Sequence, residues 1–156
     1  MKIIILTCLL VICVSLFSQP DTYEKNKAAI TAIYEGFNKR DYSVLEKYYT
    51  PDYVDHTPTF GGDSSPDGVK KGFENFQKAF PDYQMSVEDI IVTGDKASVR
   101  LLVTATNTGE LSGKPPTNKK VEVTGLNFFI FKDGKISERW GYYDTESLYK
   151  QLGPGK

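Results

Sequence analysis

An Asp-Gly pair near the C-terminal end of this 156-residue chain constrains its fold more than any other feature. Asp133 and Gly134 separate two runs rich in apolar and aromatic residues, which is a strong sequence signal for a two-residue hairpin turn. In a regular hairpin Asn127 lies opposite Trp140, and directly opposed residues share one face of the sheet. One face should therefore carry Asn127, Phe129, Trp140, Tyr142 and Asp144. An aromatic face that also holds an amide and a carboxylate is more typical of a pocket wall than of a packed core.

Apolar residues at helical spacing come before the strands. Residues 21–40 predict one amphipathic helix. A second, shorter helix is expected from a cap at Asp41 to the stop at Thr50-Pro51. Residues 57–65 are rich in Gly, Pro, Ser and Thr and predict a loop. Ser65-Pro66 then places a capping residue before a proline at the first position of a third helix.

The second half of the chain has the pattern of strands. Residues 84–93 and 96–107 flank a Gly94-Asp95 turn, and residues 109–118 form a loop before the Asp133 hairpin. A short helix over 145–152 is expected to end the chain. Helices followed by a run of antiparallel strands predict an α+β fold with the helices packed on one face of the sheet. A strongly bent sheet with helices across its mouth would form a cone around a cavity.

The N-terminus has the features of a secretory signal. Lys2 precedes an unbroken apolar run from Ile3 to Phe17, and cleavage is expected after Ser18, which leaves residues 19–156 as one domain. The alternative is an uncleaved membrane anchor, although the run is shorter than the roughly 20 residues of a membrane span. Both cysteines, Cys8 and Cys13, lie in this segment, so the mature chain would contain no disulfide. We expect a secreted or periplasmic protein without stable membrane association after cleavage.

Composition narrows the possible partners. The formal charge of −1 provides no field that would attract nucleic acid or an anionic membrane. His56 is the only histidine, which excludes a multi-histidine metal site, and no other residues have ligand spacing. We therefore expect neither metal nor cofactor.

Several motifs, taken in order, resemble the SnoaL-like polyketide (ester) cyclases of the nuclear transport factor 2-like superfamily. They are YVDHTP around His56, AFPDY at 79–83, the stretch 106–125, and DGKISERWGYYDTESLYKQLG at 133–153. The resemblance implies a cone-shaped α+β barrel, often a homodimer, whose pocket holds a small apolar or aromatic substrate. It also implies cofactor-free acid/base chemistry at Asp144, in an intramolecular aldol closure, with His56 as a pocket histidine. At the position of a second pocket histidine in many relatives, this chain has Asn107.

Each candidate residue also has a structural interpretation. Asp144 precedes Thr-Glu-Ser and is suited to cap the last helix, and His56 can be a loop residue bonded to a neighbour. Asn107 and Asn127 are candidates to hydrogen-bond a developing oxyanion. Alternatively, Asn107 is a turn residue at the end of a strand and Asn127 a buried amide satisfied by adjacent strands. Phe129, Trp140 and Tyr142 suit either a pocket wall or a core.

Two functions from different classes follow. The first is an exported cyclase- or isomerase-type enzyme centred on Asp144 and assisted by His56, with Asn107, Asn127 and the aromatic face binding the substrate. The second is a non-catalytic module that binds a small molecule outside the cytoplasm. Export and the replaced histidine favour the second, whereas the resemblance favours the first.

Overall fold

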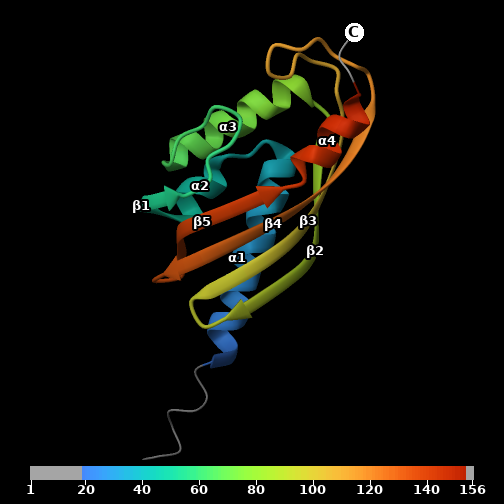
Figure 1. Cartoon of the computed structure of the whole chain (residues 1–156). Helices are drawn as coiled ribbons and strands as arrows, with labels where there is room; N and C mark the ends of the chain where they lie inside the picture. The colour runs from blue at the N-terminus through green and yellow to red at the C-terminus, as the bar shows by residue number, and fades with distance from the viewer. Residues whose placement is uncertain (1–18, 154–156) are drawn as a thin grey trace, which may run out of the picture.

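The computed structural model describes residues 19–153, and the predicted signal segment with both cysteines lies outside this range. Its helices and strands confirm the predicted order, with boundaries that differ by a few residues (Figure 1). The helices are α1 (Gln19–Lys39), α2 (Ser43–Tyr48), α3 (Pro66–Ala79) and α4 (Thr145–Leu152). The strands are β1 (Tyr49–Asp55), β2 (Gln84–Thr93), β3 (Lys96–Thr106), β4 (Lys120–Lys132) and β5 (Lys135–Tyr143).

The five strands form one curved, unclosed sheet in the order β1-β5-β4-β3-β2. The pairs β2–β3, β3–β4 and β4–β5 are antiparallel, as predicted, but β1 pairs with β5 in parallel. The sheet is therefore mixed and not purely antiparallel. The N-terminal helices lie on one side of it, and α1 crosses behind the strands in Figure 1. The fold is the predicted α+β architecture.

Local chemistry fixes the ends of the helices. The Ser65 hydroxyl accepts a hydrogen bond from the Gly68 amide at 3.0 Å, and Pro66 occupies the first turn of α3, as predicted. For α2 the expected cap at Asp41 is wrong by one residue, since Tyr42 is the N-cap. Asp41 nevertheless accepts from the amide and hydroxyl of Ser43, so it still satisfies a donor at this helix end.

The core lies between the concave face of the sheet and the helices. Alternate residues of β3 are buried, including Val99 and Leu101, and they belong to the same core cluster as Ile30 and Ile33 of α1. Because side chains alternate along a strand, this one face supplies most of the sheet's contribution to the core. Among the helices of residues 19–153, none is both long and apolar enough to cross a bilayer.

A one-residue bulge in β5 changes the predicted hairpin. The pairs Lys132–Lys135 and Phe131–Ile136 are as predicted, but Ser137 is the extra residue, and its hydroxyl donates to the Ile130 carbonyl at 3.2 Å. Beyond it, Asn127 pairs with Gly141 and not with Trp140. An extra residue in a strand moves every later side chain to the other face. The concave face of β5 therefore carries Arg139, Gly141 and Tyr143, and the opposite face carries Trp140 and Tyr142.

Candidate functional site

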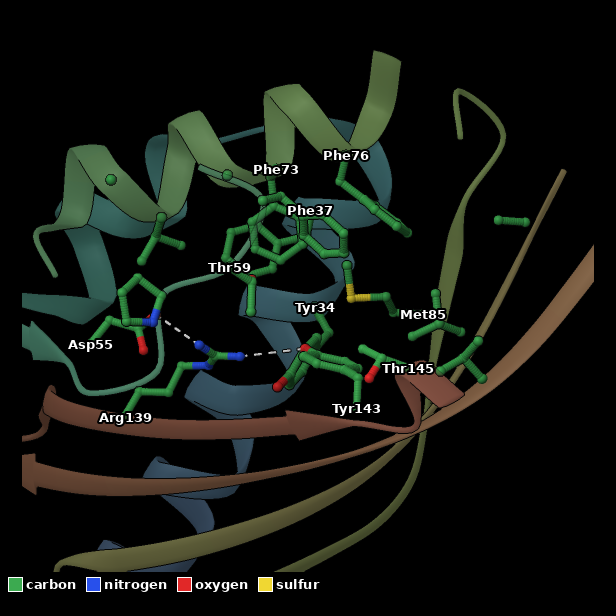
Figure 2. Close-up of a pocket in the computed structure, with 18 of the residues that line it drawn as sticks. Tyr34, Phe37, Asp55, Thr59, Phe73, Phe76, Met85, Arg139, Tyr143 and Thr145 are labelled. Atoms are coloured by element: carbon green, nitrogen blue, oxygen red, sulfur yellow. Dashed lines mark hydrogen bonds and ion pairs between the residues drawn. The ribbon is translucent and has the colours of Figure 1, made fainter. Parts of the chain in front are cut away.

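The concave side of the sheet encloses an apolar cavity beneath α3. The enclosed space is about 80 Å³, and the whole hollow, with its mouth and the solvent in front of it, is about 950 Å³. Aromatic side chains from α1 and α3 line it, namely Tyr34, Phe37, Phe73 and Phe76 (Figure 2). The mouth borders the loop between β1 and α3, where Thr59 and Phe60 contribute to the lining. An apolar cavity with a few convergent polar groups is the usual form of a small-molecule site.

One buried ion pair lies at one end of this cavity (Figure 2). The guanidinium of Arg139 donates from Nη1 to Asp55 Oδ2 at 2.7 Å, and both side chains are nearly inaccessible to solvent. Asp55 also accepts through Oδ1 from the backbone amide of Thr57 at 2.9 Å. Buried charges are stable only when they are paired and hydrogen-bonded, and this pair meets that condition.

Two further side chains orient the guanidinium. Arg139 Nε donates to Asn127 Oδ1 at 2.8 Å, and Nη2 reaches the Tyr143 hydroxyl at 3.5 Å (Figure 2). Asn127 is buried, and its Nδ2 has no partner among the described residues. Arg139, Asn127 and Tyr143 thus form one polar network at the wall of an apolar cavity.

The chain positions this network through the parallel pairing of β1 with β5. His56 donates its amide to the Arg139 carbonyl at 2.9 Å, so Asp55 is held beside Arg139 on the concave side. The Thr57 hydroxyl accepts from the Gly141 amide at 2.7 Å and secures the same junction. Gly141 is required here because a Cβ at this position would overlap the guanidinium of Arg139.

Burial determines the protonation of the groups around the pair. Desolvation raises the pKa of Tyr34 well above its ordinary value, and that of Tyr49 rises for the same reason. For Arg139, burial opposes the charge, but the neighbouring Tyr143 and Asp55 oxygens outweigh it and the pKa rises. At physiological pH, Tyr34 and Tyr49 are therefore neutral hydrogen-bond donors beside a charged guanidinium.

The structure does not place Asp144 in the cavity. Its carboxylate accepts from the Ser147 amide at 2.8 Å as the N-cap of α4, and the residue is exposed. The expected position of Asp144 on the pocket face is therefore wrong, and the capping alternative describes its contacts. The physical reason is that β5 ends at Tyr143 and the chain turns into the helix at this residue.

We expect Asp144→Ala to lower the free energy of unfolding by about 1 kcal/mol, since the amide at the start of α4 loses its acceptor. Asp144→Asn retains an acceptor oxygen and should change stability by only a few tenths of that loss. Urea unfolding of both variants measures the difference, with Glu146→Ala as a control in the same exposed turn. Equal losses for Asp144→Ala and Asp144→Asn would contradict the capping role.

His56 lies on the face of the sheet opposite the cavity. Its ring stacks on Trp140 with centroids 4.0 Å apart and planes 6° apart, and Nε2 is 2.7 Å from Glu138 Oε2. The histidine is partly exposed and is not part of the cavity lining. The expected role as a pocket histidine finds no geometric support, because strand alternation places Asp55 inside and His56 outside.

The predicted aromatic pocket wall is also only partly present. Phe129 is buried and lines the cavity, and Asn127 contacts Arg139, as the pocket interpretation requires. Trp140 and Tyr142 were expected beside them, and this expectation is wrong because the bulge at Ser137 turns both to the outer face. Tyr142 is 65% exposed there.

The hydrogen bonds of Asn107 are those of a residue that holds a loop at the end of a strand, which is one of its two predicted roles. Its Oδ1 accepts from the amide and hydroxyl of Thr117, and its Nδ2 donates to the carbonyls of Ala79 and Gly109. These bonds close the loop between β3 and β4 at the end of β3. Asn107 does not line the cavity.

Sequence reasoning missed Asp55, Arg139 and Tyr143, which supply the buried polar network. Only the bulge at Ser137 brings Arg139 and Tyr143 inward, and no residue of the hairpin marks it. An available signal was the strand alternation of residues 53–56, which sends Asp55 and His56 to opposite faces. Within residues 19–153, no three His, Cys, Asp or Glu side chains come together in a way that would hold a metal ion.

Comparisons with known proteins agree with this geometry. Residues 27–152 match the model of the SnoaL-like polyketide cyclase family. IdmH from Streptomyces antibioticus, provisionally assigned as a polyketide cyclase, is 33% identical over 83% of this chain and 99% of its own, with a TM-score of 0.74. AclR from Streptomyces galilaeus, provisionally assigned as a hydroxylase, is 32% identical over 83% and 96%, with a TM-score of 0.73. A protein of Bacillus cereus, provisionally assigned as a polyketide cyclase, is 29% identical over 83% and 80%, with a TM-score of 0.72. A comparison with proteins of curated function found no match.

Proposed function

Because the chain belongs to the SnoaL-like polyketide cyclase family, we propose that its cavity binds a small apolar or aromatic carbonyl compound and catalyses cofactor-free acid/base chemistry of the cyclase type. The observation that carries this proposal is the buried Asp55–Arg139 pair at the end of an otherwise apolar cavity. Apolar walls bind the ring of such a compound, and the polar end orients its oxygen.

An intramolecular aldol closure needs a base that removes a proton next to a carbonyl and donors that stabilise the resulting oxyanion. Arg139 and the Tyr143 hydroxyl are adjacent donors at the cavity wall, where they could stabilise such an oxyanion. Asp55 is the buried carboxylate of the lining and is the base in this proposal. The exposed Asp144 has no part in it.

A non-catalytic binding protein is the second candidate, and one observation favours it. Both oxygens of Asp55 already accept hydrogen bonds, from Arg139 and from Thr57. To take up a proton, Asp55 would have to give up one of these hydrogen bonds. The pair would then orient a ligand without exchanging protons.

Proton exchange on a model ketone separates the two candidates. We expect the protein in D₂O to accelerate exchange of the methyl protons of acetophenone, followed by ¹H NMR. Asp55→Asn should slow this exchange on the order of 100-fold, as for loss of a general base. Tyr143→Phe, which leaves the ion pair intact, should slow it less, and Asp144→Asn should leave it unchanged.

Circular dichroism of each variant separates lost chemistry from lost folding. Binding of acetophenone without any accelerated exchange would contradict the catalytic proposal and favour the binding protein. If Asp144→Asn abolished the exchange while Asp55→Asn did not, the acid/base group would be Asp144 after all.

We propose, further, that two copies associate through the outer face of the sheet. Apolar side chains form a band there: the exposed Val54, Leu126, Phe128 and Tyr142, with the half-buried Trp140 beside Phe128. The Asp89–Arg100 pair flanks the band on one side and the His56–Glu138 pair on the other. Exposed apolar bands of this kind are typical of protein–protein interfaces, and the family resemblance, which implies a homodimer, favours a second copy of the chain as the occupant.

Sedimentation of the mature chain tests this association. We expect a dimer that Leu126→Lys converts to a monomer with unchanged circular dichroism, because a charge would then lie in the apolar band. Tyr23→Lys, at an exposed aromatic residue of α1, is the matched control and should remain dimeric. A monomeric wild-type protein would refute the proposal.

We also propose that the protein is exported after cleavage behind Ser18. N-terminal sequencing of the protein recovered outside the cytoplasm tests this proposal.

A further inference from the structure

We infer that the cavity is selective for a neutral ligand oxygen that only accepts hydrogen bonds, as in an aryl ketone, and that Tyr34, Tyr49 and Tyr143 recognise it together with Arg139. The inference rests on the proposed function only in taking the same cavity as the binding site. It concerns which chemical class enters, whether or not a reaction follows.

The first argument is a surplus of donors in the lining. Tyr34 and Tyr49 line the cavity, both residues are 4% exposed, and neither hydroxyl makes a hydrogen bond within residues 19–153. The Tyr143 hydroxyl accepts from Arg139 and donates to no described residue. Figure 2 shows Tyr34 and Tyr143 beside the guanidinium at the same end of the cavity. Buried donors are normally satisfied, so a ligand oxygen or water must accept these protons.

The second argument is a shortage of acceptors at that end. Asp55 is the carboxylate there, and Arg139 and Thr57 already use both of its oxygens. The other carboxylate of the lining, Asp63, lies at the exposed mouth and accepts from Ser65. A ligand that brings its own N–H or O–H donor would have to share these oxygens with Arg139 and Thr57. A ligand that brings only an acceptor completes the hydrogen bonds of the site.

The third argument is charge. The charged groups of the lining are Asp55, Asp63 and Arg139, which is one more carboxylate than cations. Arg139 is already neutralised by Asp55, so no uncompensated cation is present to offset the desolvation of a ligand anion. An ammonium group at this end would lie beside the Arg139 guanidinium, and the carboxylate there already accepts from Arg139 and Thr57. These observations favour an uncharged carbonyl.

Binding of four one-ring compounds of similar size tests the inference: acetophenone, ethylbenzene, benzoate and benzylammonium. Titration calorimetry, or protein NMR for weak binding, gives each affinity. We expect acetophenone to bind about 10-fold more tightly than ethylbenzene, the difference that one buried hydrogen bond of about 1.4 kcal/mol supplies. Benzoate and benzylammonium should bind more weakly than acetophenone.

Tyr-to-Phe variants assign the contribution of each hydroxyl. Tyr34→Phe, Tyr49→Phe and Tyr143→Phe should each reduce acetophenone affinity about 3- to 10-fold and leave ethylbenzene affinity unchanged. Tyr142→Phe is the matched control, because it removes a neighbouring hydroxyl on the outer face, and it should change neither affinity. Retained binding of ethylbenzene shows that a variant still folds.

Three outcomes overturn the inference: ethylbenzene binding as tightly as acetophenone, benzoate or benzylammonium binding best, or Tyr-to-Phe variants without effect on the ketone. Failure of the proposed chemistry looks different. Selective ketone binding without proton exchange refutes the catalytic proposal and leaves this inference intact.

Discussion

Arg139→Gln is expected to lower the free energy of unfolding by about 3–5 kcal/mol, the usual loss when one partner of a buried ion pair is removed. Asp55 would remain buried without its cation, and Asn127 Oδ1 would lose the donor 2.8 Å away. Because many small domains have only about 5–15 kcal/mol of stability, this loss removes a large share of it. Urea unfolding followed by circular dichroism gives the value.

Arg100→Gln is the matched control for that measurement. Arg100 also pairs with an aspartate across neighbouring strands, Asp89, but both side chains are about half exposed or more. Exposed pairs contribute at most about 1 kcal/mol, so this variant should be close to wild type. The double variant Asp55→Asn/Arg139→Gln should recover part of the loss, because no unpaired charge then stays buried. Similar losses for Arg139→Gln and Arg100→Gln would refute the importance of the buried pair.

Asn107→Ala is expected to lower the free energy of unfolding by about 2–4 kcal/mol. The side chain is 1% exposed and bonds to four groups. The Ala79 carbonyl would keep two backbone amides as donors, but the other three groups, on Gly109 and Thr117, would lose this partner. Since Asn107 lies outside the cavity lining, ketone affinity should stay within twofold of wild type when measured well below the unfolding transition. Thr108→Ala, at the adjacent exposed residue, should have little effect on stability.

Asn107 therefore separates a structural from a substrate-binding role. A variant that unfolds at much lower urea concentration but binds acetophenone normally supports the structural role. Near-normal stability with lost binding would instead restore the substrate-contact hypothesis.

Local sequence signals determined the elements of this protein and their order. The Asp133-Gly134 turn, the Ser65-Pro66 helix start and the spacing of apolar residues each depend on neighbouring residues only, and each is confirmed. These predictions hold because the conformation of a turn and the capping of a helix depend on only a few consecutive residues. Together with the family resemblance, these signals were sufficient for the α+β fold.

The tertiary structure alone decided which side chains face the cavity. The bulge at Ser137 and the parallel pairing of β1 with β5 bring Arg139 and Asp55 together over 84 residues of sequence, and nothing local to either residue specifies that contact. A shift of one residue reverses the face of every later side chain, so the pocket wall contains Arg139 where Trp140 was predicted. Likewise, Asp144 caps a helix because β5 ends one residue before it.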